Sequence, residues 1–183
     1  MKMKKCAYCR NEFEPFRMGQ KACSVECATQ MARVKREKAE RSLDRLKREA
    51  LKTRSDWIKD AQTAFNAYIR ERDAKEPCIC CGKPLGQGEV GGGFDAGHYR
   101  STGSAPHLRF DERNCHGQRK QCNRYGAGRA VDYRLGLIAR VGLEEVERLE
   151  ADNEPRKWSI EELKAIRDTY RAKLKELRNG RRG

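Results

Sequence analysis

The 183-residue sequence lacks any long apolar run, and this absence excludes integral membrane proteins. A membrane-spanning helix needs roughly 18 consecutive apolar residues, whereas the mean hydropathy here is -0.98. We therefore expect a soluble protein with no membrane partner. Residues 1–6 are basic but lead directly into cysteines instead of an apolar stretch, so no secretory signal is readable. These features predict a cytoplasmic protein.

Apolar and acidic residues are also scarce. Hydrophobic residues make up 37% of the chain, which is little for one large core at this length. The 41 Lys and Arg outnumber the 27 Asp and Glu and give a formal net charge of +14. Such an excess of positive charge favours a polyanionic partner, and nucleic acid is the first candidate. We expect small metal-stabilised modules joined by charged helices.

Cysteine, by contrast, is abundant, with 9 residues that mostly stand in close pairs. In a reducing compartment this pattern favours metal ligands over disulfides. Cys6, Cys9, Cys23 and Cys27 form two turns whose sulfur atoms can reach the same ion, as in a structural zinc knuckle. Free thiols in a loose N-terminus are the alternative. Because residues 1–27 contain so few apolar side chains, we expect them to fold as a zinc knuckle.

Four further segments follow the knuckle. Residues 28–54 contain neither Gly nor Pro and are dense in helix-forming residues, which predicts a basic helical arm. Residues 55–77 begin with a candidate cap, Ser55, and place apolar side chains three and four residues apart. This spacing predicts an amphipathic helix that packs on the core. Residues 78–130 are rich in turns, cysteine and histidine, and helical patterns return in residues 131–183.

Two local signals refine this division. The string Ser159–Glu162 matches a capping box, and Trp158 and Leu163 are placed as its hydrophobic staple, which predicts a helix to about Arg178. The glycine-rich tract 86–93 predicts a hairpin tip. The expected fold class is therefore α+β and mostly helical.

Residues 78–130 combine a second cysteine pattern with candidate catalytic residues. Cys78 and Cys81 form a second pair with two residues between them, and Cys122 is followed directly by Asn123. Between these groups stand Asp95, His98 and Asn114. This order resembles the zinc-supported HNH nucleases, and the resemblance implies a small ββα finger that holds one catalytic metal while zinc clamps its ends.

Hydrolysis of a phosphodiester needs an activated water and a cation on the scissile phosphate. In this interpretation His98 is the general base, because the unperturbed pKa of imidazole lies near 6.5. Asp95 and Asn123 offer oxygen ligands to Mg²⁺ or Mn²⁺. Asn114 is expected to hydrogen-bond either backbone or His98, and so to hold the loop or the imidazole tautomer. The alternative is a non-catalytic, zinc-stabilised DNA-binding or architectural protein.

Basic side chains in two places are the expected DNA contacts, since Lys and Arg bind phosphates without reading sequence. The arm contributes Arg33, Lys35, Arg36 and Lys38, and the finger contributes Arg100, Arg109, Arg113 and Arg124. For the arm, the alternative is a solvated helix face, which charge runs usually are.

Several strings resemble one family, the NinG (Rap) recombination proteins of lambdoid phages. These strings are residues 94–100, 108–114 and 122–123, and the segments 55–73 and 158–178 are similar as well. The resemblance covers nearly the whole chain and is weakest in the basic arm. It implies a structure-specific endonuclease that acts with a divalent metal on branched recombination intermediates such as Holliday junctions and D-loops. Phage recombination proteins and a second copy of the chain are the further candidate partners.

The sequence departs from the family pattern at one ligand position. That pattern has a second cysteine pair ending at the position of Cys122, but Arg119 stands where its first cysteine would be. The fourth zinc ligand must then be Cys115, His116 or water, or it is missing. We expect Cys115, with the Arg119 side chain turned outward because a cation beside zinc is unfavourable.

Overall fold

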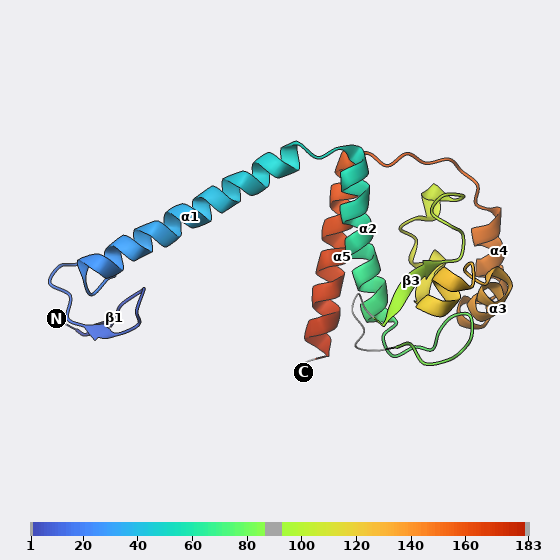
Figure 1. Ribbon diagram of the computed structural model, residues 1–183, viewed down its shortest axis with the longest axis horizontal. Coiled ribbons are helices and arrows are strands. Elements are labelled where there is room, and N and C mark those ends of the chain that lie inside the picture. Colours follow the sequence, from blue (N-terminus) through green and yellow to red (C-terminus); the bar gives the residue numbers. More distant parts are fainter. Residues whose placement is uncertain (1, 87–92, 182–183) are drawn as a thin grey trace. The chain divides into compact units, whose positions relative to one another are not determined.

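The computed structural model describes residues 2–86 and 93–181 (Figure 1). The chain divides into two compact units, Met1–Lys52 and Thr53–Gly183. The two small sheets and the predominance of helix match the expected α+β class. Most of the predicted glycine-rich tip at 86–93 lies outside the described residues. Within the described part of the chain, the helices are all too short or too polar to cross a membrane.

The N-terminal unit consists of a small hairpin and one long helix. Strands β1 (Lys4–Lys5) and β2 (Glu12–Phe13) pair antiparallel and precede helix α1 (Val25–Ala50). None of the described residues of α1 is buried. The buried apolar residues of this unit, among those described, are Cys6, Pro15 and Ala22. The unit therefore has almost no hydrophobic core.

The boundary between the first two helices differs from the predicted one. Helix α1 ends at Ala50, and α2 (Arg54–Arg72) begins before Ser55. Thr53 is the cap of α2: the Asp56 amide donates to its hydroxyl, and the Thr53 amide donates to the Asp56 carboxylate at 3.0 Å. The prediction of Ser55 is wrong because a capping box needs an acidic or amide side chain three residues on, which Thr53 has and Ser55 lacks.

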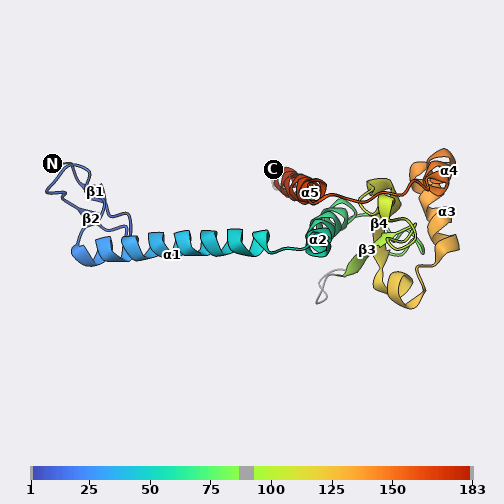
Figure 2. The same cartoon turned by 90° about the horizontal axis from the view of Figure 1, so that it is seen from above.

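Helices α2 and α5 (Ile160–Gly180) lie side by side (Figures 1 and 2), and Figure 1 shows that they run in the same direction. The predicted capping box at Ser159 is confirmed at the start of α5. One face of α2 is buried against Leu163 and Tyr170 of α5; its members are Trp57, Ala61, Ala64, Phe65 and Ile69. Burial of each large apolar side chain contributes on the order of 1.5–3 kcal/mol. This confirms the predicted amphipathic helix.

An antiparallel hairpin packs on α2. Strand β3 (Phe94–His98) pairs with β4 (Cys115–Arg119), so that the first residue of each strand faces the last residue of the other. The connection between them contains two short 3₁₀ turns, η1 (Pro106–Leu108) and η2 (Glu112–Asn114). A π-helical turn, η3 (Gln121–Tyr125), follows β4 directly. The register of this hairpin decides which candidate site residues meet.

Helices α3 (Ala130–Val141) and α4 (Leu143–Ala151) complete the second unit. They form a second apolar cluster with the turn after Cys78 and the β3–β4 connection; its buried members are Ile79, Ala105, Leu108, Tyr133, Leu137, Val146 and Leu149. A Cβ at Gly136 would lie 1.8 Å from the Ile79 carbonyl oxygen. Glycine at this position therefore lets the α3 backbone lie directly against the cysteine-bearing turn.

Candidate functional site

The four N-terminal cysteines converge on one point. The Sγ atoms of Cys6, Cys9, Cys23 and Cys27 all lie within 4.8 Å of one another. The sulfur of Cys23 lies 3.6 Å from that of Cys9 and 3.6 Å from that of Cys27. Four thiolates around zinc at about 2.3 Å stand roughly 3.8 Å apart, so this group fits a tetrahedral site. The cluster could hold a metal ion compatible with zinc.

Backbone donors favour the charged form of one of these cysteines, Cys6. The amide of Cys23 donates to Cys6 Sγ at 3.5 Å. Burial opposes ionisation of Cys6, but this and other backbone hydrogen bonds outweigh it and lower the pKa of the thiol to about 6. A thiolate is the form that binds metal. The hairpin and the start of α1 thus prearrange the four ligands.

The central cluster contains three cysteines. The Sγ atoms of Cys78, Cys81 and Cys122 lie within 4.8 Å of one another, and this group too could hold a metal ion. A hydrogen bond from Cys80 lowers the pKa of the Cys78 thiol to about 4, with help from the Arg119 amide at 3.3 Å and against the effect of burial. The central cluster therefore offers three cysteine ligands to one metal ion.

The backbone of Arg119 takes the place that Cys23 has in the N-terminal cluster. In the N-terminal cluster the Cys23 amide donates to Cys6 Sγ. In the central cluster the Arg119 amide donates to Cys78 Sγ in the same way. The side chain of Arg119 is partly exposed and borders an open pocket beside Cys81 and Cys122. Residue 119 therefore stands at the fourth-ligand position without supplying a ligand.

Cys115 does not join this cluster, so the expectation that it supplies the fourth ligand is wrong. It is the first residue of β4, and Arg119 is the last. Four residues along a strand span about 13 Å. The thiol is fully buried in the α2–α5 core, where burial raises its pKa, and its Sγ lies 3.8 Å from His98 Nδ1.

His116, the other protein alternative, is also directed away from the cluster. Its Nδ1 lies 3.1 Å from an Arg72 nitrogen, and its Nε2 lies 3.1 Å from the Arg113 carbonyl oxygen. The buried carboxylate of Asp73 accepts from Arg72 at 2.6 Å and from the Gly117 amide at 2.7 Å. This network ties the end of α2 to β4, which is a structural role.

Asp95 and Asn123 are brought together by the turn after β4. The Asn123 amide donates to Asp95 Oδ2 at 3.0 Å, and Arg124 donates to both carboxylate oxygens at 2.8 Å. Burial opposes ionisation of Asp95, but Arg124 and Asn123 hold the pKa of its carboxyl below the ordinary value. Single π-helical turns are frequent at functional sites, and η3 here directs both partners toward β3.

Asn114 fixes the loop between the two strands. The side chain is fully buried, and its oxygen accepts from the Arg100 amide at 2.8 Å. Its nitrogen donates to the carbonyl oxygens of Arg100 at 3.0 Å and Leu108 at 3.1 Å. Of the two expected partners, backbone and His98, the structure shows backbone.

His98 lies on the other side of β3 from Asp95. Side chains alternate along a strand, so residues three apart point to opposite faces. The imidazole stacks on Phe65 with ring centroids 6.0 Å apart, and Nε2 lies 2.9 Å from the Arg109 carbonyl oxygen. An Nε2–H donor to that carbonyl leaves Nδ1 facing Cys115. Burial lowers the pKa of His98, so the ring is neutral at neutral pH. The structure therefore does not join His98 to the Asp95–Asn123 pair.

The predicted DNA contacts separate into two groups. The four arm residues, Arg33, Lys35, Arg36 and Lys38, are exposed on α1. The finger arginines bind protein groups instead: Arg100 donates to the Leu149 carbonyl at 2.8 Å, and Arg109 donates to the Thr102 carbonyl at 3.1 Å. Arg113 forms a bidentate pair with Asp111. In this structure Arg100, Arg109 and Arg113 thus bind groups within the unit, and their role as phosphate ligands stays a prediction.

Gln118 is a site neighbour that the sequence reasoning missed. It lies opposite Asp95 in the β3–β4 register and is buried. Its Nε2 donates to the Gly128 carbonyl at 2.9 Å and to Cys80 Sγ at 2.8 Å. Gln118 thereby connects β4 to the second cysteine turn and to the loop after η3. Only the strand register, which the sequence does not reveal, would have identified it.

Comparison with known proteins places the whole chain in one group. A family model described as "Bacteriophage Lambda NinG protein" matches residues 1–180. "Protein ninG" of Escherichia phage lambda is 46% identical over 94% of this chain and 91% of its own length. The protein of the same name from Salmonella phage P22 is 45% identical over 94% of this chain and 92% of its own. No solved structure matches the chain. The chain therefore belongs to the NinG family.

Proposed function

We propose that this protein is an HNH-like, metal-dependent endonuclease that acts on branched DNA recombination intermediates such as Holliday junctions and D-loops. The observation that carries the proposal is the pairing of Asp95 with Asn123 where η3 returns onto the β3–β4 hairpin. Two strands followed by a helical turn are the order expected for a ββα finger. The branched substrate is inferred from the family resemblance.

The Asp95–Asn123 pair offers the ligand types that Mg²⁺ and Mn²⁺ prefer. Mg²⁺ is commonly bound through one or two carboxylates together with waters and substrate phosphates. In the structure, Arg124 binds both oxygens of Asp95, so the pair fits a cation only after this arginine leaves. A DNA phosphate gives a guanidinium an equivalent bidentate partner. We therefore propose that Arg124 moves from Asp95 to a phosphate when DNA binds, and that the bound cation neutralises charge on the scissile phosphate.

His98 remains the candidate base in this proposal. Its pKa is lowered by burial, so the neutral, proton-accepting form is present at neutral pH. Its Nδ1, however, contacts the buried Cys115 thiol and does not lie on the Asp95 face of β3. A base role thus requires the ring to turn away from Phe65. This orientation favours the second candidate function, a non-catalytic zinc-stabilised DNA-binding protein in which His98 only packs.

A cleavage assay separates the two functions. The parent protein, incubated with Mg²⁺ or Mn²⁺, should cut a four-way junction in preference to linear duplex, and a chelator should stop the reaction. We expect Asp95→Ala and Asn123→Ala to lower the cleavage rate by at least about 100-fold. Asp168→Ala is the matched control, because Asp168 is an exposed carboxylate on α5 that pairs with Arg167 at 2.8 Å.

The outcomes of this assay decide between the candidates. A parent protein that binds the junction but never cuts it would make the non-catalytic function correct. Equal cleavage by His98→Ala and the parent would remove His98 as the base while leaving the Asp95–Asn123 site in place. Retention of activity by Asp95→Ala would show that this pair is not the cation site.

The basic arm supplies a separate test of DNA binding. Reversal of the charges at Arg33, Lys35, Arg36 and Lys38 should weaken junction binding and flatten its salt dependence. Each lost phosphate contact lowers the slope of log affinity against log salt by about 0.9. A variant with the parental slope would show that the arm is a solvated helix face.

A further inference from the structure

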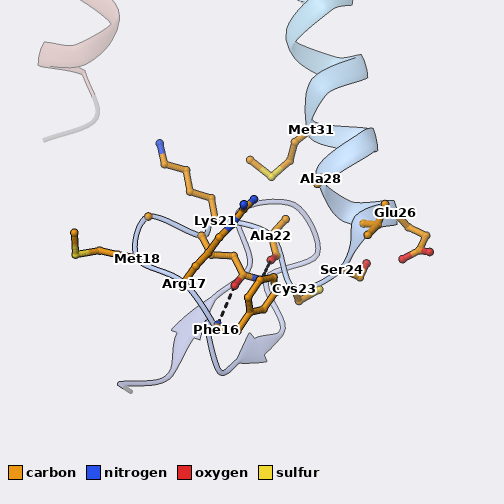
Figure 3. A pocket seen from close by; sticks show the side chains of 13 residues that line it. Phe16, Arg17, Met18, Lys21, Ala22, Cys23, Ser24, Glu26, Ala28 and Met31 are labelled. Carbon is orange, nitrogen blue, oxygen red and sulfur yellow. Dashed lines mark hydrogen bonds between the residues drawn. The ribbon is translucent and has the colours of Figure 1, made fainter.

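An open groove of about 860 Å³ lies in the N-terminal unit, between the loop 16–22 and the first turns of α1 (Figure 3). Two large apolar side chains on this loop stand almost free of other protein atoms. Phe16 is 78% exposed and Met18 is 98% exposed. From α1, Ala28 and Met31 also line the groove. The unit therefore presents an apolar surface that none of its described residues covers.

The loop that carries these side chains is internally fixed. The Gln20 side chain accepts a hydrogen bond from the Phe16 amide at 3.0 Å, as a dashed line marks in Figure 3, and donates to the Ala22 carbonyl at 2.8 Å. Gly19 has a φ of 83°, a value that favours glycine, and so permits the turn. Phe16 and Met18 are thus held outward by the loop conformation. Exposed apolar patches of this kind mark interaction surfaces.

The charges around the groove indicate what covers it. Two cations, Arg17 and Lys21, and one carboxylate, Glu26, line the groove, and the Arg17 guanidinium carbon lies 5.9 Å from the Phe16 ring centroid. The Met1–Lys52 unit carries more than twice as many Lys and Arg as Asp and Glu. An aromatic face bordered by cations binds unpaired nucleobases, because the ring stacks on the base while the cations meet the phosphates. A neutral or basic protein surface would form no ion pairs with Arg17 and Lys21, so it fits the groove less well.

We propose that this groove binds an unpaired nucleotide of single-stranded DNA, with the base on Phe16 and its flanking phosphates on Arg17 and Lys21. The proposal rests on the proposed function in taking DNA as the ligand, and it deepens that function. Phosphate contacts along α1 do not distinguish paired from unpaired DNA. A stacking groove would give the N-terminal unit a preference for the unpaired bases that D-loops and strained branches expose.

Binding of fluorescent oligothymidine to the full chain, without added Mg²⁺ or Mn²⁺, tests the proposal. Because stacking on an aromatic side chain contributes about 1–3 kcal/mol per base, we expect Phe16→Ala to weaken binding roughly tenfold. Phe16→Trp should keep the parental affinity. Leu51→Ala is the matched control, since Leu51 is 82% exposed but lies outside the groove. Zinc analysis of each variant verifies that the knuckle is intact.

Salt dependence separates stacking from charge. Phe16→Ala should lower affinity by the same factor at every salt concentration, because stacking releases no counterions. Lys21→Ala should instead reduce the slope of log affinity against log salt by about 0.7, the value for one phosphate contact on a single strand. Binding of perfectly paired duplex should be equal for Phe16→Ala and the parent.

Two results would overturn the proposal. Parental affinity of zinc-loaded Phe16→Ala for oligothymidine would show that no base stacks in the groove. If that variant instead lost self-association in sedimentation with its oligothymidine affinity unchanged, the occupant would be a second copy of the chain. Neither result depends on cleavage: a protein that binds oligothymidine through Phe16 but cuts no junction refutes only the proposed endonuclease.

Discussion

The two cysteine clusters share an arrangement but differ in what surrounds them. The N-terminal cluster has four cysteines in a unit whose buried apolar residues, among those described, are only Cys6, Pro15 and Ala22. The central cluster has three cysteines and borders helices with their own apolar cores. A unit without a core would depend on a bound metal to fold, whereas a unit with a core would tolerate the loss of one ligand. This difference explains how Arg119 can stand at a ligand position.

The largest expected effect comes from Cys9→Ser. Structural zinc contributes about 10–16 kcal/mol in small zinc-dependent modules, so loss of one N-terminal ligand should unfold residues 2–24. Zinc content should fall by one ion per chain, and amide exchange of the N-terminal unit should lose its protection. Both tryptophans, Trp57 and Trp158, lie in the second unit. Their fluorescence-detected unfolding should therefore be unchanged, and a large shift in it would contradict the separation of the two units.

Arg119→Cys should make the central cluster resemble the N-terminal one. The variant places a thiol where the backbone already donates to Cys78 Sγ. We expect zinc affinity at this site to rise at least about 100-fold, the upper range seen for outer ligand partners, as measured by competition with a chromogenic chelator. Arg119→Ala removes the cation without adding a ligand. It therefore distinguishes the effect of the lost positive charge from the effect of the added thiol. Equal affinities of the Cys and Ala variants would show that residue 119 does not face the metal.

Cys115→Ala tests the corrected ligand assignment. Because Cys115 is buried in the α2–α5 core and not in the cluster, its loss should leave zinc content unchanged. The small cavity should lower the free energy of unfolding by on the order of 1 kcal/mol, measured by urea titration of tryptophan fluorescence. Loss of zinc from this variant would restore Cys115 as a ligand.

The smallest expected effect is a difference between the two units in how their stability falls with pH. Metal loss through thiolate protonation affects both clusters, but His98 adds a second acid-sensitive group in the second unit only. Burial lowers its folded-state pKa, so its contribution to stability is complete above the unfolded value of about 6.5 and declines as the pH falls below it. His98→Gln should therefore flatten the decline in urea midpoint below pH 6.5. An unchanged decline would show that His98 does not contribute to the acid sensitivity.

Features set by neighbouring residues were predictable from the sequence. The Ser159 capping box, the apolar face of α2 and the two N-terminal cysteine pairs, Cys6–Cys9 and Cys23–Cys27, depend on spacings of a few residues. Each places its partners on adjacent turns of one element or in one short loop. Sequence distance then translates directly into spatial distance.

Features that depend on strand register were not predictable. Cys115 and Arg119 are close in sequence, but an extended strand puts them at opposite ends of β4. Asp95 and His98 stand three residues apart and so face opposite sides of β3. Arg124 binds Asp95 because residues 121–125 form a π-helical turn. The wider turn changes the direction of the side chains after Cys122. These positions follow from tertiary packing, which residue spacing alone does not encode.

The length of α1 sets a scale for any ligand of the N-terminal unit. At about 1.5 Å per residue, its 26 residues extend over roughly 39 Å. One turn of B-DNA rises about 34–36 Å. A duplex lying along this helix would meet its basic side chains over approximately one turn, so its strands would present the same groove at both ends. If DNA binds as proposed, its contact with α1 would extend over about 11 base pairs.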